Sequence, residues 1–325
     1  MTNSNDELMM ETMYWWGIPT LFRCEHQKDI SKCDIALVGV PHSTGNGTTE
    51  RDQHLGPRAV RHVSAGLRRV HLDFNINPWK QKKIFDLGDV ALPHANNNER
   101  CIEDITNFYE RIAKEKKPVV SIGGDHSITG GILQGLGSNN LELTKGKKIS
   151  FLHIDAHTDT FSQLDHFMGA KKSAAHWGAY LVEQGIIDPK TSMQIGMRGN
   201  PRTLDWLQPS YDLGYNVVTM DEFKKRGIDD VIRETLDKIG DNPVYITFDL
   251  DSLDATVAPA VSNIEPGFTG FSVDEAKALI QSVKNKNVIG GDVVCLMPTK
   301  DQKNNITSMV AASIMFEIIS VIACN

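Results

Sequence analysis

Several features are missing or scarce in this sequence, and each absence excludes a class of protein. No run of basic residues occurs and the formal net charge is −7, so the basic face that a nucleic-acid-binding protein needs is missing. The five cysteines are scattered without a Cys-x-x-Cys pair, which indicates free thiols in a reducing compartment rather than a disulfide framework. The chain starts with polar and acidic residues unlike a secretory signal, and no apolar run reaches the roughly 18 residues of a membrane span. We therefore expect a cytoplasmic protein that contacts neither nucleic acid nor a membrane.

Strand-like apolar runs alternate with helical patterns along the whole chain. Strands are expected at residues 34–40, 83–87, 118–122, 149–155, 192–197, 216–219, 244–250, 287–289 and 292–294. Helices are expected at residues 56–67, 103–113, 127–136, 174–184, from 221, at 229–239, 273–283 and 306–322. Apolar residues continue through the strands, which is typical of a sheet covered on both faces. The pattern predicts the α/β class, as a single-domain doubly wound, mostly parallel sheet with helices on both faces.

The first 30 residues are expected to form an N-terminal extension, followed by one α/β catalytic domain at residues 31–325. Within the extension, residues 14–23 are apolar and aromatic, and Gly17 and Pro19 break regular structure. Such a segment either packs as a strap on the core of its own domain or contacts another subunit, because aromatic residues are enriched at interface centres.

The most informative stretch is residues 153–159, His-Ile-Asp-Ala-His-Thr-Asp, which follows an apolar run at 149–152. In an extended chain alternate side chains share a face, so His153, Asp155 and His157 would point one way, with Asp159 just beyond. Burying these groups costs several kcal/mol unless the charges are paired or a metal is present. The alternative is a polar strand end that forms hydrogen bonds with neighbouring loops.

Two further strand ends carry similar groups. Asp125 and His126 follow the run at 118–122, and Asp249 and Asp251 end the run at 244–250. Ligands bind at the carboxyl ends of the strands in open α/β sheets. Three strands that deliver carboxylates and imidazoles to one edge predict a metal site, with enough ligands for two ions.

The ligand types limit the choice of metal. Carboxylates with some imidazole suit Mn²⁺, and imidazole also suits Ni²⁺ and Zn²⁺. A structural zinc site would more typically use cysteine, and no cysteine lies near these stretches. Asp155 and Asp249 are well placed to bridge two ions, because each has a second candidate ligand two residues later. Two divalent ions about 3.5–4 Å apart can hold a nucleophilic hydroxide between them.

These stretches resemble the signatures of the ureohydrolase superfamily, which includes arginase, agmatinase and guanidinobutyrase. The resemblance rests on residues 124–127 (Gly-Asp-His-Ser), 155–159 (Asp-Ala-His-Thr-Asp) and 248–254 (Phe-Asp-Leu-Asp-Ser-Leu-Asp), and extends from Gly39 to Val294. It implies two metal ions, Mn²⁺ or Ni²⁺, one held by His126, Asp155, Asp159 and Asp249, and the other by Asp155, His157, Asp249 and Asp251. His153 is expected to have a structural or supporting role rather than to bind metal.

The resemblance also implies the reaction. A hydroxide that bridges the metals would attack the guanidinium carbon of a guanidino compound, and an amine would leave. Glu265 matches the acid that pairs with the guanidinium, and a buried planar cation needs such a partner. Asp251 is suited to accept the proton of the hydroxide. A proton shuttle is expected at His176, with His166 as the alternative. Members of the superfamily commonly form trimers and hexamers, so we expect a homo- or hetero-oligomer.

The sequence also departs from the family pattern. Residues 255–265 replace glycines and prolines with bulkier residues, and Cys295 stands where agmatinase-type enzymes normally have a glutamate. These departures argue against a plain arginase or agmatinase and favour guanidinobutyrate, guanidinopropionate, guanidine or a biguanide such as metformin as the substrate. Two alternatives are a non-catalytic partner subunit of a hetero-oligomer, which the complete ligand set opposes, and an amide hydrolase similar to the histone deacetylases.

The loop after the second motif bears on substrate shape. Residues 161–175 contain no recognisable clamp for an α-carboxylate, whereas Phe167, Met168 and the following Trp177 are large and apolar. A rim of this kind favours a small or alkyl-substituted guanidino compound over L-arginine, because an unpaired carboxylate would lose its hydration. The alternative is that these three side chains pack inward and do not contact substrate.

Overall fold

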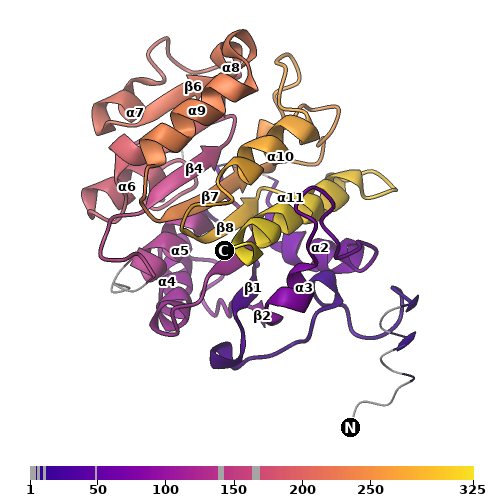
Figure 1. The fold of residues 1–325 in the computed structure, drawn as a ribbon. Helices are drawn as coiled ribbons and strands as arrows, with labels where there is room; N and C mark the ends of the chain where they lie inside the picture. Colours follow the sequence, from indigo (N-terminus) through magenta and orange to yellow (C-terminus); the bar gives the residue numbers. More distant parts are fainter. Residues whose placement is uncertain (1–4, 6–7, 10–11, 48–49, 138–142, 163–168) are drawn as a thin grey trace.

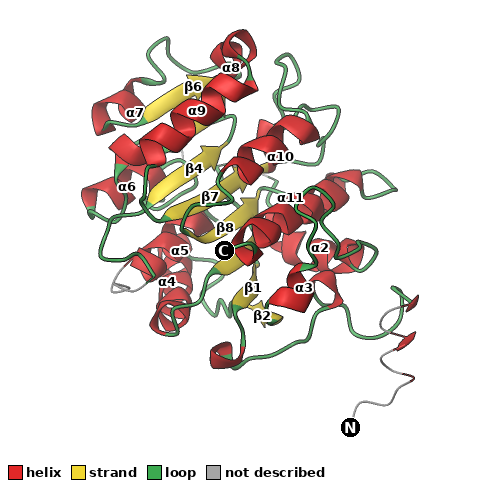
Figure 2. Ribbon diagram, viewed as in Figure 1, coloured by secondary structure: helices red, strands yellow, loops and turns green. Residues whose placement is uncertain are grey.

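The computed structural model describes residues 5, 8–9, 12–47, 50–137, 143–162 and 169–325. Eight parallel strands form one sheet in the order β2-β1-β3-β8-β7-β4-β5-β6 (Figures 1 and 2). The strands are β1 Ile35–Val40, β2 Ile84–Asp89, β3 Val119–Gly123, β4 Ser150–Ile154, β5 Met193–Met197, β6 Asn216–Thr219, β7 Val244–Asp249 and β8 Val288–Val294. The predicted α/β class is confirmed.

Helices cover both faces of this sheet, as the sequence predicts. Ile35 and Leu37 of β1 point into one apolar cluster, while Ala36 and Val38 point into the other, because successive side chains of a strand face opposite ways. One face is covered by α2 Gly56–Ser64, α3 Pro78–Gln81, α8 Met220–Arg226, α9 Ile228–Ile239, α10 Val273–Ser282 and α11 Ile306–Ala323. The other is covered by α4 Asn98–Lys114, α5 Ser127–Gly137, α6 Trp177–Glu183 and α7 Gln208–Leu213. Short 3₁₀ helices lie at Leu21–Arg23, Ile30–Lys32, Gln53–Leu55, Pro189–Thr191, Leu250–Ser252 and Pro298–Lys300.

Strand β8 differs from the expectation. The sequence predicts two short strands separated by Gly290 and Gly291, but the structure has one continuous strand. A Cβ atom at Gly290 would lie 2.5 Å from the carbonyl oxygen of Val119, and one at Gly291 would lie 2.6 Å from that of Ile246. The glycine pair therefore allows β8 to pack closely between β3 and β7 instead of interrupting it.

Helix α11 is apolar along most of its length, although Thr307, Ser308 and Glu317 interrupt the apolar run. By length and composition alone Ile306–Ala323 would qualify as a membrane span, but 78% of the helix is buried inside the protein, where it belongs to the apolar core. Glu317, the charged residue of this helix, accepts a hydrogen bond from Gln281 Nε2 at 2.8 Å and lies 2.9 Å from His71 Nε2. It is thus a core helix whose one charged side chain is compensated.

The N-terminal aromatic segment divides into two parts. Leu21 and Phe22 are buried in the core, which is the strap arrangement. Tyr14, Trp15 and Ile18 are instead exposed, with 48%, 74% and 86% of their surfaces accessible. Contact of this exposed part with another subunit stays a prediction.

A buried ion pair fastens α2 to the edge of the sheet. Arg61 Nε and Nη2 donate hydrogen bonds of 2.8 and 2.9 Å to the two carboxylate oxygens of Asp86 in β2. Asp86 also accepts from the backbone N–H groups of Leu21 and Gly88, each at 2.9 Å. Burial alone would raise the pKa of Asp86, but Arg61 and these N–H groups together lower it below its ordinary value. The carboxylate is therefore held in its charged form.

We expect Arg61→Met to lower the free energy of unfolding by about 3–5 kcal/mol, because it leaves the charge of Asp86 buried without its partner. Urea denaturation followed by circular dichroism would measure the loss. Arg233→Met is the matched control, because Arg233 pairs with Asp230 on the exposed surface and its loss should leave the midpoint unchanged. If the urea midpoint of Arg61→Met equals that of the wild type, the Arg61–Asp86 ion pair does not stabilise the fold as we infer.

Candidate metal centre

Three groups of acidic and imidazole side chains meet at one edge of the sheet. His126 follows β3, Asp155 follows β4, and Asp249 is the last residue of β7. These strands lie close together in the order β3-β8-β7-β4, and their carboxyl ends share an edge because they are parallel. The structure therefore brings together the three stretches that the sequence predicts to meet.

The local geometry differs from the alternating strand that the sequence suggests. Strand β4 ends at Ile154, and Asp155 Oδ1 then accepts a hydrogen bond of 2.8 Å from the backbone N–H of His157. Asp249 Oδ1 likewise accepts from the N–H of Asp251 at 2.9 Å. An aspartate that bonds to the N–H two residues later forms a turn. These two turns, rather than extended chain, place the second residue of each pair beside the first.

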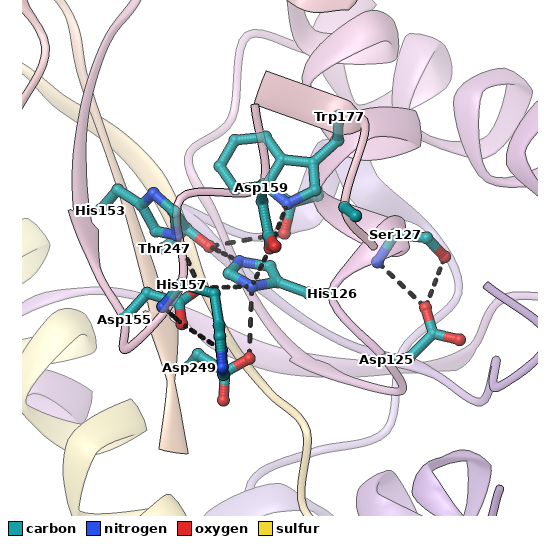
Figure 3. Close-up of polar contacts among 12 residues, drawn as sticks. Asp125, His126, Ser127, His153, Asp155, His157, Asp159, Trp177, Thr247 and Asp249 are labelled. Atoms are coloured by element: carbon teal, nitrogen blue, oxygen red, sulfur yellow. Dashed lines mark hydrogen bonds and ion pairs between the residues drawn. The ribbon is translucent and has the colours of Figure 1, made fainter. Parts of the chain in front are cut away.

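The first cluster surrounds the Nδ1 atom of His126 (Figure 3). Asp155 Oδ2 and Asp159 Oδ2 each lie 3.0 Å from this atom, and Asp249 Oδ2 lies 3.3 Å from it. His126 Nδ1 is buried, and it has no hydrogen-bond partner of acceptable geometry among the described residues. Three carboxylate oxygens directed at one unsatisfied imidazole nitrogen are the arrangement expected around a cation.

A hydrogen-bond relay beneath the cluster determines which nitrogen of His126 carries the proton. His126 Nε2 lies 2.8 Å from Thr247 Oγ1, and the hydroxyl of Thr247 donates to Asp292 Oδ1 at 2.7 Å. Asp292 Oδ2 accepts two further hydroxyl bonds, from Thr129 and Tyr245. Because Thr247 uses its one proton toward Asp292, it must accept from His126 Nε2–H. The lone pair of His126 therefore lies on Nδ1, which faces the carboxylates and is available to a metal.

The electrostatics agree with this arrangement. Burial opposes protonation of His126, yet Asp155, Asp159 and Asp249 raise its pKa well above the ordinary value. Without another cation, the imidazole itself would have to carry the positive charge. A metal ion would supply that charge and leave the imidazole neutral.

The second cluster lies around His157 and shares one residue with the first. His157 Nδ1 lies 3.2 Å from Asp251 Oδ2 and 3.5 Å from Asp155 Oδ1. Asp155 thus directs Oδ2 toward one cluster and Oδ1 toward the other, as a bridging ligand would. Burial raises the pKa of Asp251 well above its ordinary value, and the nearby charge of Asp249 adds to this effect.

The donor set fits two divalent ions in charge and in chemistry. Four carboxylates would be neutralised by two doubly charged ions, and mixed oxygen and imidazole donors suit Mn²⁺ or Ni²⁺. The structure places all six predicted ligands in these two clusters: His126, Asp155, His157, Asp159, Asp249 and Asp251.

His153 lies next to the first cluster, where it contacts a ligand. Its Nε2 atom lies 2.7 Å from Asp155 Oδ2, and its Nδ1 atom lies 3.2 Å from Gln194 Nε2. Since the amide nitrogen of Gln194 can only donate, His153 Nδ1 accepts and Nε2–H donates to Asp155. This arrangement supports the expected role in positioning Asp155.

Trp177 is a residue for which the sequence expectation is wrong. The sequence predicts an apolar group at the substrate rim here, but the side chain is fully buried. Its indole Nε1–H donates to Asp159 Oδ2 at 2.9 Å and holds this carboxylate beside His126. The inward-packing alternative is therefore correct for Trp177, whereas Phe167 and Met168 lie outside the described residues.

A cavity of about 470 Å³ opens onto both clusters. Glu265 lines it and places Oε1 at 3.3 Å from His157 Nε2. Cys295 also lines the cavity; burial and the charges of Asp249 and Asp251 raise the pKa of its thiol, which is therefore neutral. A neutral group thus borders the two ligand clusters at the position where the family pattern leads us to expect an acid.

The proton shuttle is the least supported of the predicted roles. His176 is buried, its Nδ1 atom lies 2.6 Å from Ser173 Oγ, and it is not among the described residues that line the cavity. His166, the alternative, lies outside the described residues. The shuttle role of His176 stays a prediction.

The segment after β5 reaches the site, although its sequence does not predict this. Arg198 is buried and donates to the carbonyl oxygens of Ser252 and Leu253 at 3.1 and 3.0 Å. Gly199 has a φ of +104°, and a Cβ atom there would lie 2.6 Å from Glu265 Cδ. In the sequence, a glycine after an arginine gives little indication of a site residue. The closeness of Gly199 to Glu265 depends on a contact between distant parts of the chain.

We expect Asp155→Ala and Asp249→Ala each to lose both metal ions together. The two oxygens of Asp155 face both clusters, and Asp249 lies beside His126 while its other oxygen holds the backbone of Asp251 in the second cluster. Elemental analysis should find about two ions per chain in the wild type and close to none in either variant. Asp254→Asn is the matched control: Asp254 bonds to Thr256 outside the clusters, so its replacement should leave the metal content unchanged. A full metal pair in either alanine variant would show that the ligand assignment is wrong.

Comparisons with known proteins identify the family of this chain. A sequence model of the Arginase family matches residues 33–320. The guanidinopropionase of Pseudomonas aeruginosa is 30% identical over 309 residues, covering 94% of this chain and 92% of the relative. The mitochondrial agmatinase of Gallus gallus is 30% identical over 306 residues, covering 94% and 86%. The structure of proclavaminate amidino hydrolase from Streptomyces clavuligerus superposes with a TM-score of 0.86 at 27% identity, covering 96% of this chain and 99% of that one.

The family match spans most of the chain, and the identities hold over more than nine tenths of it. The solved structure shares the all-parallel sheet and its helical layers. The chain therefore belongs to the arginase family and is a hydrolase that acts on C–N bonds.

Proposed function

We propose that this chain hydrolyses a C–N bond of a guanidino compound with the help of two divalent ions, Mn²⁺ or Ni²⁺. The observation that carries the proposal is the pair of ligand clusters joined through Asp155, at the floor of a cavity bordered by Glu265. The complete ligand set argues against the alternative of a non-catalytic partner subunit. Because relatives of equal identity are named for different substrates, family membership alone does not identify the guanidino compound.

The proposed reaction gives a role to each of these residues. His126, Asp155, Asp159 and Asp249 would hold one ion, and Asp155, His157, Asp249 and Asp251 the other. The bound ions would lower the pKa of water and so supply a nucleophile at neutral pH. Glu265 would pair with the guanidinium and orient its carbon above the clusters. Asp251, whose Oδ2 lies 3.2 Å from His157 Nδ1 beside the cavity floor, would take up the proton at its carboxylate.

The cavity wall bears on the substrate. Ala174, Ala175, Phe161 and the neutral thiol of Cys295 make much of it apolar. Among the described residues no pair of groups forms a clamp for an α-amino acid. We therefore favour guanidinobutyrate, guanidinopropionate, guanidine or a biguanide over L-arginine.

We expect the metal-loaded protein to release an amine from guanidino compounds that lack an α-amino acid head, and to act weakly on L-arginine. The assay would follow amine and urea with protein loaded with Mn²⁺ or with Ni²⁺. Asp249→Ala serves as the inactive control, since it should lose the metals. L-Arginine as the best substrate would contradict the proposed selectivity, and no turnover of any guanidino compound by a fully loaded wild type would contradict the proposed function.

We expect Gly199→Ala to behave like Glu265→Gln, because the added methyl group would displace the Glu265 carboxylate. Both variants should lose roughly 10²-fold in kcat/KM, as expected when a buried charge partner is lost, and both should keep their metals. Gly214→Ala controls for backbone strain: its φ is +94°, but its added methyl would meet Lys190 and Pro189 at an ordinary 3.8 Å. Normal kinetics for Gly199→Ala would show that Glu265 does not need its observed position.

A further inference from the structure

The cavity is electrically asymmetric. Its floor consists of buried acidic ligands, including Asp159 and Asp249, and Glu265 stands beside them. Its mouth is formed in part by the exposed residues 200–203, Asn-Pro-Arg-Thr. The acidic groups therefore lie where metals and a guanidinium would bind, and a different set of side chains meets the rest of the substrate.

Arg202 is the charged residue of this mouth. Among the described residues that line the cavity, it is the one cation apart from the histidines of the clusters. Within the described part of the chain Arg202 forms no ion pair, whereas Arg61, Arg226 and Arg233 each pair with an aspartate. The polar residues around the opening, Asn46, Asn200, Thr203 and Asn263, are neutral. The described mouth thus offers a positive charge and no carboxylate.

The segment that leads to Arg202 is anchored beside the clusters. Four residues earlier, the buried Arg198 donates two hydrogen bonds to the carbonyl oxygens of Ser252 and Leu253, directly after the ligand Asp251. Pro201 restricts the backbone on both of its sides. The segment that carries Arg202 is therefore tied to the same short helix, Leu250–Ser252, that carries Asp251.

We propose that Arg202 binds the carboxylate at the far end of the substrate, so that the substrates are ω-guanidino carboxylates rather than agmatine. This inference rests on the proposed function and specifies its substrate class. A guanidinium at the floor would pair with Glu265, and the carboxylate would accept paired hydrogen bonds from the arginine fork. Phe161 and Trp206, which also line the cavity, would contact the methylene chain between them.

The same charge distribution disfavours substrates that carry an ammonium group at the end away from the guanidinium. The terminal ammonium of agmatine would lie near Arg202, and the described mouth gives it no carboxylate partner. The α-ammonium of L-arginine would meet the same difficulty even though its carboxylate could pair. The selection therefore depends on the sign of the charge at the tail and does not require a dedicated clamp for an amino acid.

The test compares three compounds with similar chains on the metal-loaded protein: 4-guanidinobutyrate with an anionic tail, agmatine with a cationic tail, and N-propylguanidine with a neutral tail. The wild type should prefer 4-guanidinobutyrate to agmatine. Arg202→Gln should raise KM for 4-guanidinobutyrate about 10-fold or more, with kcat little changed, because one charge-assisted hydrogen-bonded pair is lost. The kinetics of N-propylguanidine should stay within roughly twofold, since its tail makes no such bond.

Arg202→Glu provides a charge reversal and should shift the preference toward agmatine. Arg233→Gln, on the exposed surface away from the cavity, is the control for the general loss of a positive charge and should leave all three compounds unaffected. Agmatine as the preferred substrate of the wild type would overturn the proposal. So would equal KM values for 4-guanidinobutyrate in the wild type and Arg202→Gln.

A binding measurement separates this proposal from the proposed function. The rise in melting temperature of the metal-loaded protein with added 4-guanidinobutyrate reports binding whether or not the compound is cleaved. If no compound is hydrolysed, the proposed function fails; a rise that Arg202→Gln reduces would still support the carboxylate subsite. An equal rise in both proteins, or none in the wild type, would overturn the subsite.

Discussion

The site depends on the shared carboxylate of Asp155. Its two oxygens face two different imidazoles, His126 and His157, so neither cluster is complete without it. His153 donates to one of these oxygens, and the backbone of His157 donates to the other. Such a group is costly to bury unless positive charge is close by, so the fold can place it at the sheet edge only because histidines and, when bound, cations compensate it.

Much of this arrangement can be predicted from the sequence because it depends on local patterns. Continuous apolar runs indicate the strands, and parallel strands bring the residues after their carboxyl ends to one edge, which is why His126, Asp155 and Asp249 are expected to meet. The turn at Asp155 could not be predicted, because an extended strand would also place Asp155 and His157 on the same face. The glycine pair of β8 looks like an interruption, since its close packing between β3 and β7 depends on the tertiary structure.

The remaining differences concern contacts between distant parts of the chain. Trp177 looks like a rim residue from its apolar neighbourhood, but its indole N–H satisfies a carboxylate 18 residues away. Nothing in residues 198–206 alone signals that the segment faces the loop that carries Glu265. Local periodicity indicates which side chains follow the carboxyl ends of the strands. The shape of the cavity depends on how the loops pack against one another, and the pattern of a single sequence does not encode that packing.

Arg198, which is hydrogen-bonded to the backbone of Ser252 and Leu253, lies at the boundary between the sheet and the mouth of the cavity. Before this residue, the chain is the buried strand β5, which pairs with the strand that precedes Asp155. After Gly199, the exposed residues of the mouth can change without touching a ligand. Substrate choice can therefore diverge through a few rim positions while the hydrolytic apparatus stays intact. A scaffold divided in this way is open to re-engineering: the rim could be randomised in a library, with retention of metal binding serving as a simple check that the interior survived.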